Sequence, residues 1–175
     1  MSLSDLSSLG SFVSGIAVLV SLIYLSFQIR QNTLHQRATM QQGRAAREVD
    51  IILRTAEPAL ADVMMRGRMG DASLAPAELE QFLRVATAMF LNFEDGFLQA
   101  KAGMLEQRNI EGDDEALRKH IFPHLGYSTA WTMLAPGMQT EFRTHIDGLL
   151  RETPVAHVRD RIATWKALLA ESETA

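Results

Sequence analysis

The chain has 175 residues, enough for one membrane-spanning helix and one small domain. It contains no cysteine, which excludes disulfides and thiolate metal sites. Its formal charge of −4 is unevenly spread: residues 30–47 carry four arginines and no acid, whereas residues 48–175 hold 13 basic and 20 acidic residues, a net charge of −7 that argues against nucleic-acid binding.

Residues 9–29 are expected to form a transmembrane helix. The 24 residues from Leu6 to Ile29 include no charged side chain, and about twenty helical residues span the ~30 Å hydrocarbon core of a bilayer. Tyr24 lies near one end, where amphipathic rings are favoured. One alternative is a secretory signal peptide, but MSLSDLSSL has no basic residue and no small-residue cleavage site follows Ile29. A buried core helix is the other alternative, although this run is long for one.

The arginines that follow this segment predict its orientation. Arg30, Arg37, Arg44 and Arg47 lie after the span, and no basic residue precedes it. The positive-inside rule therefore places residues 30–175 in the cytosol and leaves residues 1–8 as an extracytoplasmic stub. In a Gram-negative bacterial cell that membrane is the inner (cytoplasmic) membrane. Arg30 and Arg37 are expected to contact anionic lipid headgroups. An ordinary solvated face is the alternative interpretation of the arginine stripe.

One stripe of the span, which we call the polar seam, consists of small or hydrogen-bonding residues at alternating steps of three and four. Such a stripe follows one face of a helix. Small side chains allow close backbone approach in lipid, and hydroxyl and amide groups can bond across the contact. The alternative is that serine and glycine are simply tolerated in membrane helices. We predict that the polar seam is a helix-packing interface, formed by Ser7, Gly10, Ser14, Ala17, Ser21, Tyr24 and Gln28.

The rest of the chain is expected to be helical throughout, which makes the fold class all-α. No proline interrupts residues 30–57, so this juxtamembrane segment should continue the first helix. Residues 58–175 show helical periodicity and no strand or hairpin signal, which predicts a helical bundle. Its helices are expected to begin at Pro58, Pro76, Asp113 or Asp114, Ser128, Pro136 and Pro154. Its core is expected to include Phe82, Met89, Phe93, Phe97, Trp131, Phe142, Ile146 and Trp165.

Residues with possible chemistry are few. His120 and His124 have the spacing of two metal ligands on one helical face, but Pro123 distorts that turn, so solvated or capping histidines are the preferred interpretation. Glu94 and Asp95 could belong to a di-metal bundle, but the required Glu-x-x-His pairs do not occur; together with Asn92 they could instead contact another subunit or solvent. No catalytic, cofactor-binding or metal-ligating residue is therefore predicted, and the sequence favours a non-enzymatic protein.

The phrase LIYLSFQIRQNT, Leu22 to Thr33, resembles a family of uncharacterised bacterial single-pass membrane proteins with an N-terminal anchor. The similarity continues through Asn92-Phe93-Glu94 and reappears at Trp131 and in EFRTHIDGLL, Glu141 to Leu150. It covers most of the chain, although only the juxtamembrane phrase is distinctive. The resemblance implies the membrane topology and no particular activity, so it assigns no functional residues.

Together these observations predict a non-enzymatic, membrane-anchored helical interaction module. It would be a subunit of a homo-oligomer or of a larger inner-membrane complex, with membrane lipid and the transmembrane helices of itself or of that complex as partners. The alternative is a membrane-tethered enzyme or sensor whose bundle binds a ligand or metal. An oligomeric pore lined by serine and glutamine is a further, less favoured alternative.

Overall fold

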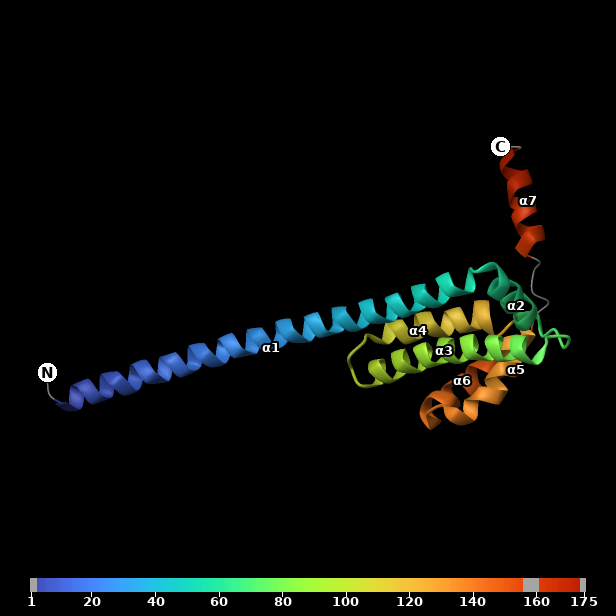
Figure 1. Ribbon diagram of the computed structural model, residues 1–175. Helices are drawn as coiled ribbons and strands as arrows, with labels where there is room; N and C mark the ends of the chain where they lie inside the picture. The colour runs from blue at the N-terminus through green and yellow to red at the C-terminus, as the bar shows by residue number, and fades with distance from the viewer. Residues whose placement is uncertain (1–2, 156–160, 174–175) are drawn as a thin grey trace. The chain divides into compact units, whose positions relative to one another are not determined.

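A computed structural model describes residues 3–155 and 161–173. Within these ranges every regular element is a helix (Figure 1), which confirms the predicted all-α fold class. The chain divides into two units, Met1–Gly43 and Arg44–Ala175. Helix α1 (Leu3–Thr55) supplies all the described residues of the first unit and the first twelve residues of the second. The predicted helical continuation of the anchor is thus confirmed, and it ends three residues before Pro58.

The first unit is a helix whose apolar stretch is exposed in the part of the chain that the structure describes. Among the described residues, α1 is the one helix long and apolar enough to span a membrane, with a mean hydropathy of 2.1 in its most apolar 18-residue stretch. None of that stretch is buried. This exposure argues against the alternative of a buried core helix, because a core helix covers its apolar face with other elements.

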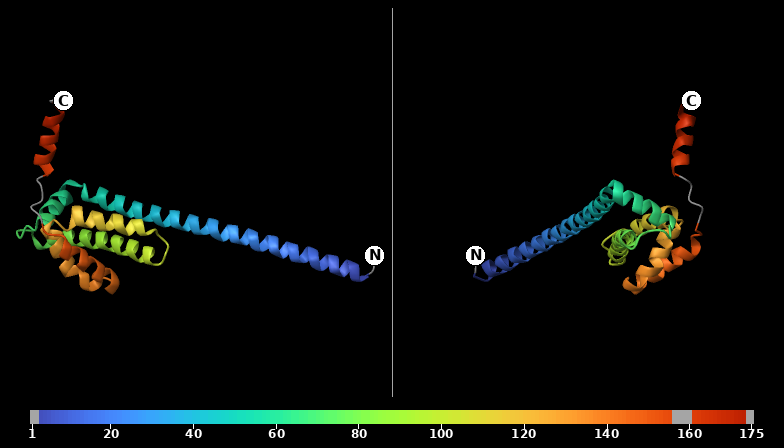
Figure 2. Two further views of the ribbon diagram at one scale, coloured as in Figure 1. Left: turned by 180° about the vertical axis from the view of Figure 1, so that it is seen from behind. Right: turned by 45° about the vertical axis from the view of Figure 1, so that its right-hand side comes forward.

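In the second unit, four other helices pack against the long helix α3 (Pro76–Lys101). They are α2 (Pro58–Met69), α4 (Gln107–Ala116), α5 (Leu125–Leu134) and α6 (Thr140–Glu152). Helix α2 also packs against α5. The views in Figures 1 and 2 agree that α3 and α4 lie side by side. Three further segments complete the unit: the π-helical turn Leu117–Ile121, the 3₁₀ turn Ala135–Gly137 and helix α7 (Arg161–Glu173).

Two of the predicted helix starts are confirmed. Pro58 and Pro76 each occupy the first turn of a helix, where a missing backbone N–H costs nothing. Helix α2 ends at Gly70 with a φ of 76°, a left-handed conformation that glycine adopts without strain. Glu78 completes the start of α3, because its carboxylate accepts a hydrogen bond from the N–H of Ala75 at 2.8 Å.

The other predicted starts are wrong, and at Asp113 and Asp114 the reason is that the side chains bind Arg44 and His145 instead of capping a helix. Helix α4 begins at Gln107, and Asp113 and Asp114 lie inside it. Helix α5 begins at Leu125, and the hydroxyl of Ser128 donates to the carbonyl of Phe122 at 2.9 Å. Helix α6 begins at Thr140, after the 3₁₀ turn that contains Pro136. Pro154 is not helical, residues 156–160 lie outside the described residues, and α7 is described from Arg161.

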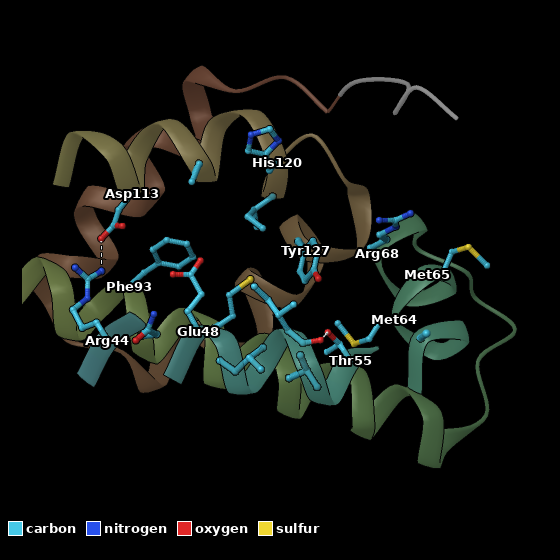
Figure 3. A pocket seen from close by; sticks show the side chains of 18 residues that line it. Arg44, Glu48, Thr55, Met64, Met65, Arg68, Phe93, Asp113, His120 and Tyr127 are labelled. Atoms are coloured by element: carbon cyan, nitrogen blue, oxygen red, sulfur yellow. Dashed lines mark hydrogen bonds and ion pairs between the residues drawn. The ribbon is translucent and has the colours of Figure 1, made fainter. Parts of the chain in front are cut away.

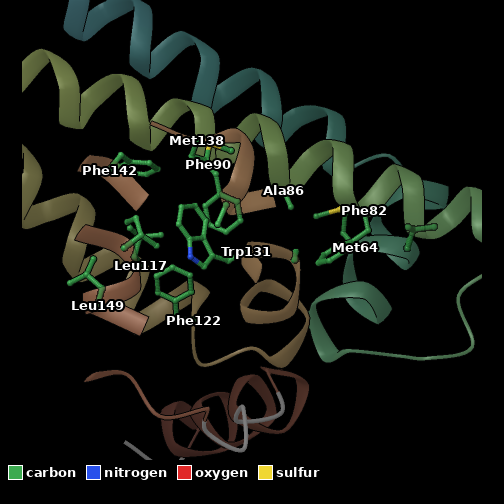
Figure 4. Close-up of a cluster of buried hydrophobic side chains, with 14 residues drawn as sticks. Met64, Phe82, Ala86, Phe90, Leu117, Phe122, Trp131, Met138, Phe142 and Leu149 are labelled. Carbon is green, nitrogen blue, oxygen red and sulfur yellow. The ribbon is translucent and has the colours of Figure 1, made fainter. Parts of the chain in front are cut away.

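The core of the second unit is a cluster of aromatic and aliphatic side chains (Figure 4). The ring of Trp131 meets those of Phe90 and Phe142 edge-on, with centroids 5.0 and 5.8 Å apart. Its indole N–H donates to a carboxylate oxygen of Asp147 at 2.8 Å, so the buried polar group is satisfied. The largest fully buried side chains are Trp131, Phe90, Phe122, Phe142, Leu117 and Ile146.

Half of the predicted core residues are confirmed and half are not. Phe82, Trp131, Phe142 and Ile146 are buried. On α3 the buried face is rotated from the expected one: Phe90 is fully buried, whereas Met89, Phe93 and Phe97 are only partly buried. Trp165 on α7 is 65% exposed, so its assignment to the core was wrong. Periodicity located an apolar stripe but could not decide which edge of that stripe faces the other helices.

Helices α2 and α5 cross at a pair of glycines. A Cβ added at Gly126 would lie 2.8 Å from the carbonyl carbon of Gly67 and closer still to its oxygen. A Cβ at Gly67 would in turn lie inside the ring of Phe82. The two backbones are therefore in direct contact, an approach that only residues without side chains permit.

Candidate functional site

Every residue of the polar seam is exposed in the first unit, as are its neighbours, so exposure alone does not distinguish the seam. Two of its polar groups already have partners inside α1. The Ser21 hydroxyl donates to the carbonyl of Ala17 at 2.8 Å, and the Gln28 amide donates to the Tyr24 hydroxyl at 3.0 Å. These two groups therefore do not depend on another helix for a hydrogen-bond partner. The case for the seam as a packing interface then depends more on its small side chains than on hydrogen bonds.

The arginines of the basic segment fall into two groups. Arg30 is exposed and Arg37 is partly exposed, and their contact with lipid headgroups stays a prediction. Arg44 and Arg47 belong to the second unit, where they bind carboxylates of the same chain. Arg44 pairs with Asp113 of α4 at 2.6 Å, and Arg47 pairs with Asp95 of α3. These two arginines attach residues 44–55 of α1 to the bundle.

The Arg44–Asp113 pair is largely shielded from water. The Arg44 side chain is 14% exposed, and its guanidinium lies against the backbone of Gly96. A Cβ at Gly96 would come 2.9 Å from one guanidinium nitrogen and closer to the other atoms, so a larger residue there would displace the Arg44 guanidinium. Burial raises the pKa of Asp113, and the hydrogen bond from Arg44 offsets only part of that effect. The Arg44–Asp113 pair therefore holds α1 against α4, and the desolvation of both charges opposes part of its stabilising effect.

The polar residues noted on α3 make contacts within the chain. Asn92 accepts a hydrogen bond from Nε of Arg47 at 3.3 Å, and Asp95 pairs with the same arginine. Glu94 accepts the backbone N–H of Gln139 at 2.6 Å, immediately before α6. These carboxylates order neighbouring helices, which accounts for them without a di-metal centre or a second subunit.

The histidines are dispersed. His120 is exposed, as expected for a solvated side chain. His124 is buried and stands at the N-cap position of α5 without a side-chain capping bond, so the interpretation of a solvated or capping side chain was wrong there. His145 bonds Asp114 at 2.7 Å, a pair that the sequence analysis missed because 31 residues separate its members. Among the described residues, no three His, Asp or Glu side chains gather in the geometry of a metal site.

A cleft of about 640 Å³ lies between residues 44–55 of α1 and the rest of the second unit (Figure 3). It exists because long arginine side chains, rather than close backbone packing, hold this part of α1 against α3 and α4. Most of its lining is apolar: Ile51, Ile52, Met64, Met65, Val85, Met89, Phe93 and Ile121. Its polar lining includes Glu48, Arg68, His120 and Tyr127. The sequence analysis did not predict this cleft, because its walls come from six separate segments.

Comparison of the chain with protein-family models, curated proteins and solved structures finds no match. Any functional conclusion therefore has to come from the exposed apolar helix and the cleft themselves.

Proposed function

We propose that the chain is a single-pass membrane protein: a non-enzymatic helical module anchored by residues 9–29 and serving as a subunit of a homo-oligomer or of a larger membrane complex. The observation that carries this proposal is the uncharged helical stretch whose described side chains are exposed on every side. A helix that is apolar all round needs an apolar environment, and this one is long enough to cross a bilayer. The exposed side chains include Phe12, Leu19, Ile23 and Phe27.

The proposed location is a bacterial inner membrane, with residues 1–8 outside and the bundle in the cytosol. The four arginines after the span support this orientation, and the membrane-facing pair Arg30 and Arg37 supplies the headgroup contacts. A fluorescent protein fused after Ala175 should be bright, and alkaline phosphatase fused at the same place should be inactive. The opposite pattern would refute the orientation, and recovery of the intact chain in the soluble fraction would refute the anchor.

Assembly is proposed to occur through the polar seam. Its small side chains permit close approach of a second helix, whereas the opposite face presents bulky residues to lipid. Single cysteines provide the test, because the natural chain has none. In membranes, disulfide cross-linking should be strongest at positions 14, 17 and 21 and weak at positions 12, 19 and 23. Stronger cross-linking at the second set would show that the seam is not the interface.

A bulky substitution distinguishes self-assembly from assembly with another protein. Ser14→Ile with Ser21→Ile should separate the backbones, whereas Leu19→Ile with Ile23→Leu is the matched control that preserves side-chain volume. If the first pair lowers the native mass of the purified protein and the control does not, the partner is a second copy. If it instead removes a co-purifying membrane protein, the partner is that protein.

Ligand binding by the cytosolic bundle is the second candidate function, and the cleft is the observation that favours it. Its volume lies within the range of small-molecule sites, and a few polar groups stand among apolar side chains. This function is compatible with the membrane anchor, since a sensor can be tethered to the surface that supplies its ligand.

A further inference from the structure

The cleft contains a cation with no acidic partner, and this cation is Arg68. Its Nε is buried and has no hydrogen-bond partner, and within the described ranges Arg68 makes no ion pair. Arg66, two residues earlier on the same helix, bonds Asp62 at 2.9 Å and also pairs with Glu78. Carboxylates of α2 and α3 thus neutralise Arg66, whereas Arg68 faces the cleft. A half-buried guanidinium without an ionic partner destabilises the protein, and a bound anion would offset that loss of free energy.

Tyr127 provides a second donor beside this arginine. Burial raises the pKa of its hydroxyl and the nearby Arg68 acts in the opposite direction, so the group is neutral at physiological pH and can donate a hydrogen bond. No hydrogen bond from this hydroxyl is formed within the part of the chain that the structure describes. Figure 3 shows Tyr127 between Phe93 and Arg68, directed into the cleft. Arg68 and Tyr127 together present a charged donor and a neutral donor to the same space.

The far end of the cleft has the opposite polarity. Glu48 lies toward the Arg44–Asp113 pair (Figure 3), and its charge raises the pKa of Asp113. An anionic headgroup is therefore disfavoured at that end and favoured beside Arg68. Between the two ends the walls are aliphatic, aromatic and thioether side chains, and methionines adapt readily to flexible chains.

We propose that this cleft binds a single-chain anionic amphiphile, with its headgroup on Arg68 and Tyr127 and its hydrocarbon chain along Met64, Met89 and Ile51. The headgroup chemistry is a carboxylate or a phosphate, both of which match a guanidinium. The inference does not depend on the orientation of the anchor or on the polar seam, because every residue in it belongs to the second unit.

Photolabelling of the full chain in phosphatidylcholine nanodiscs tests the proposal. Three photoreactive probes of equal chain length are compared: a fatty acid, a lysophosphatidate and an uncharged fatty alcohol. Peptides that contain Met64, Met65 or Met89 should be labelled by at least one acidic probe, at least about tenfold more than by the alcohol, since a charged hydrogen bond is worth about 1.5–3 kcal/mol. The probe that labels more strongly identifies the source as a free fatty acid or a lysophospholipid.

Substitutions then locate the headgroup. Arg68→Gln should reduce cleft labelling about tenfold, whereas Arg84→Gln, at an exposed arginine that does not line the cleft, should leave it unchanged. Met65→Trp adds bulk to the cleft lining without altering charge and should also reduce labelling. An unchanged urea midpoint by circular dichroism confirms the fold of each variant.

Three results would overturn the proposal. The first is labelling confined to the span or absent from the cleft peptides. The second is equal labelling by the alcohol and the acids. The third is labelling that Arg68→Gln does not reduce in a folded protein.

Discussion

Phe90 and Phe93 stand three residues apart on α3, and we predict very different losses of stability when each is replaced by alanine. Phe90 is fully buried, with its ring centroid 5.0 Å from that of Trp131 and 6.3 Å from that of Phe122. Phe93 is partly buried and lines the cleft. The comparison isolates the effect of burial, because residue type, helix and substitution are the same.

The expected magnitudes follow from these surroundings. Phe90→Ala removes a ring from a closed core and leaves a cavity, which costs about 3–5 kcal/mol. Two lost aromatic contacts place it in the upper half of that range, since each contributes about 0.5–1.5 kcal/mol. Phe93→Ala enlarges a space that is already open, so the transfer of a mostly buried ring is lost without a new closed cavity, roughly 1–2.5 kcal/mol. The predicted difference is about 2–3 kcal/mol.

Urea unfolding of the full chain in a non-ionic detergent measures both values. Trp131 reports on the core, and a Trp165→Phe background removes the signal of the exposed indole. Leu91→Ala on the same helix is the control, because that side chain is 48% exposed and should cost under about 1 kcal/mol. A loss at Phe93 equal to that at Phe90 would show that the cleft is closed and that the assigned face of α3 is wrong.

Two further changes test the packing and the charge network. Gly126→Ala should lower the free energy of unfolding by about 2–3 kcal/mol or more, because the new Cβ overlaps Gly67 of α2, whereas Gly137→Ala, with open space around it, should cost under about 1 kcal/mol in the same assay. Hydrogen bonds from Arg66 and from the N–H of Ala75 hold the pKa of Glu78 below its ordinary value of 4.5. A lowered pKa in the folded state contributes stability above pH 4.5, and this stability is lost as the pH falls through the folded pKa. Because Glu78→Gln removes the titrating group, the free energy of unfolding of the variant should depend less on pH in the acid range. Urea midpoints between about pH 7 and pH 3 measure this dependence, and parallel curves for wild type and variant would contradict it.

Local features of the sequence were sufficient for the helical fold class and for two helix starts. The charge-free run from Leu6 to Ile29 predicted a helix suited to a membrane. Pro58 and Pro76 predicted helix starts correctly, because proline restricts the backbone whatever surrounds it. Asp113 and Ser128 misled the prediction, because polar side chains that cap helices can bond equally well to distant partners.

Only the tertiary structure decided which face of each helix is buried and what lies beside it. Periodicity marks an apolar stripe, but Phe90 rather than Phe93 became the centre of the core because α5 and α6 approach α3 from that side. The ion pair of Arg44 with Asp113 joins residues 69 positions apart, and both line the cleft that Arg68 faces. Backbone preferences act between near neighbours and can be read along the chain, whereas a cleft and its unpaired cation depend on how distant surfaces fit together.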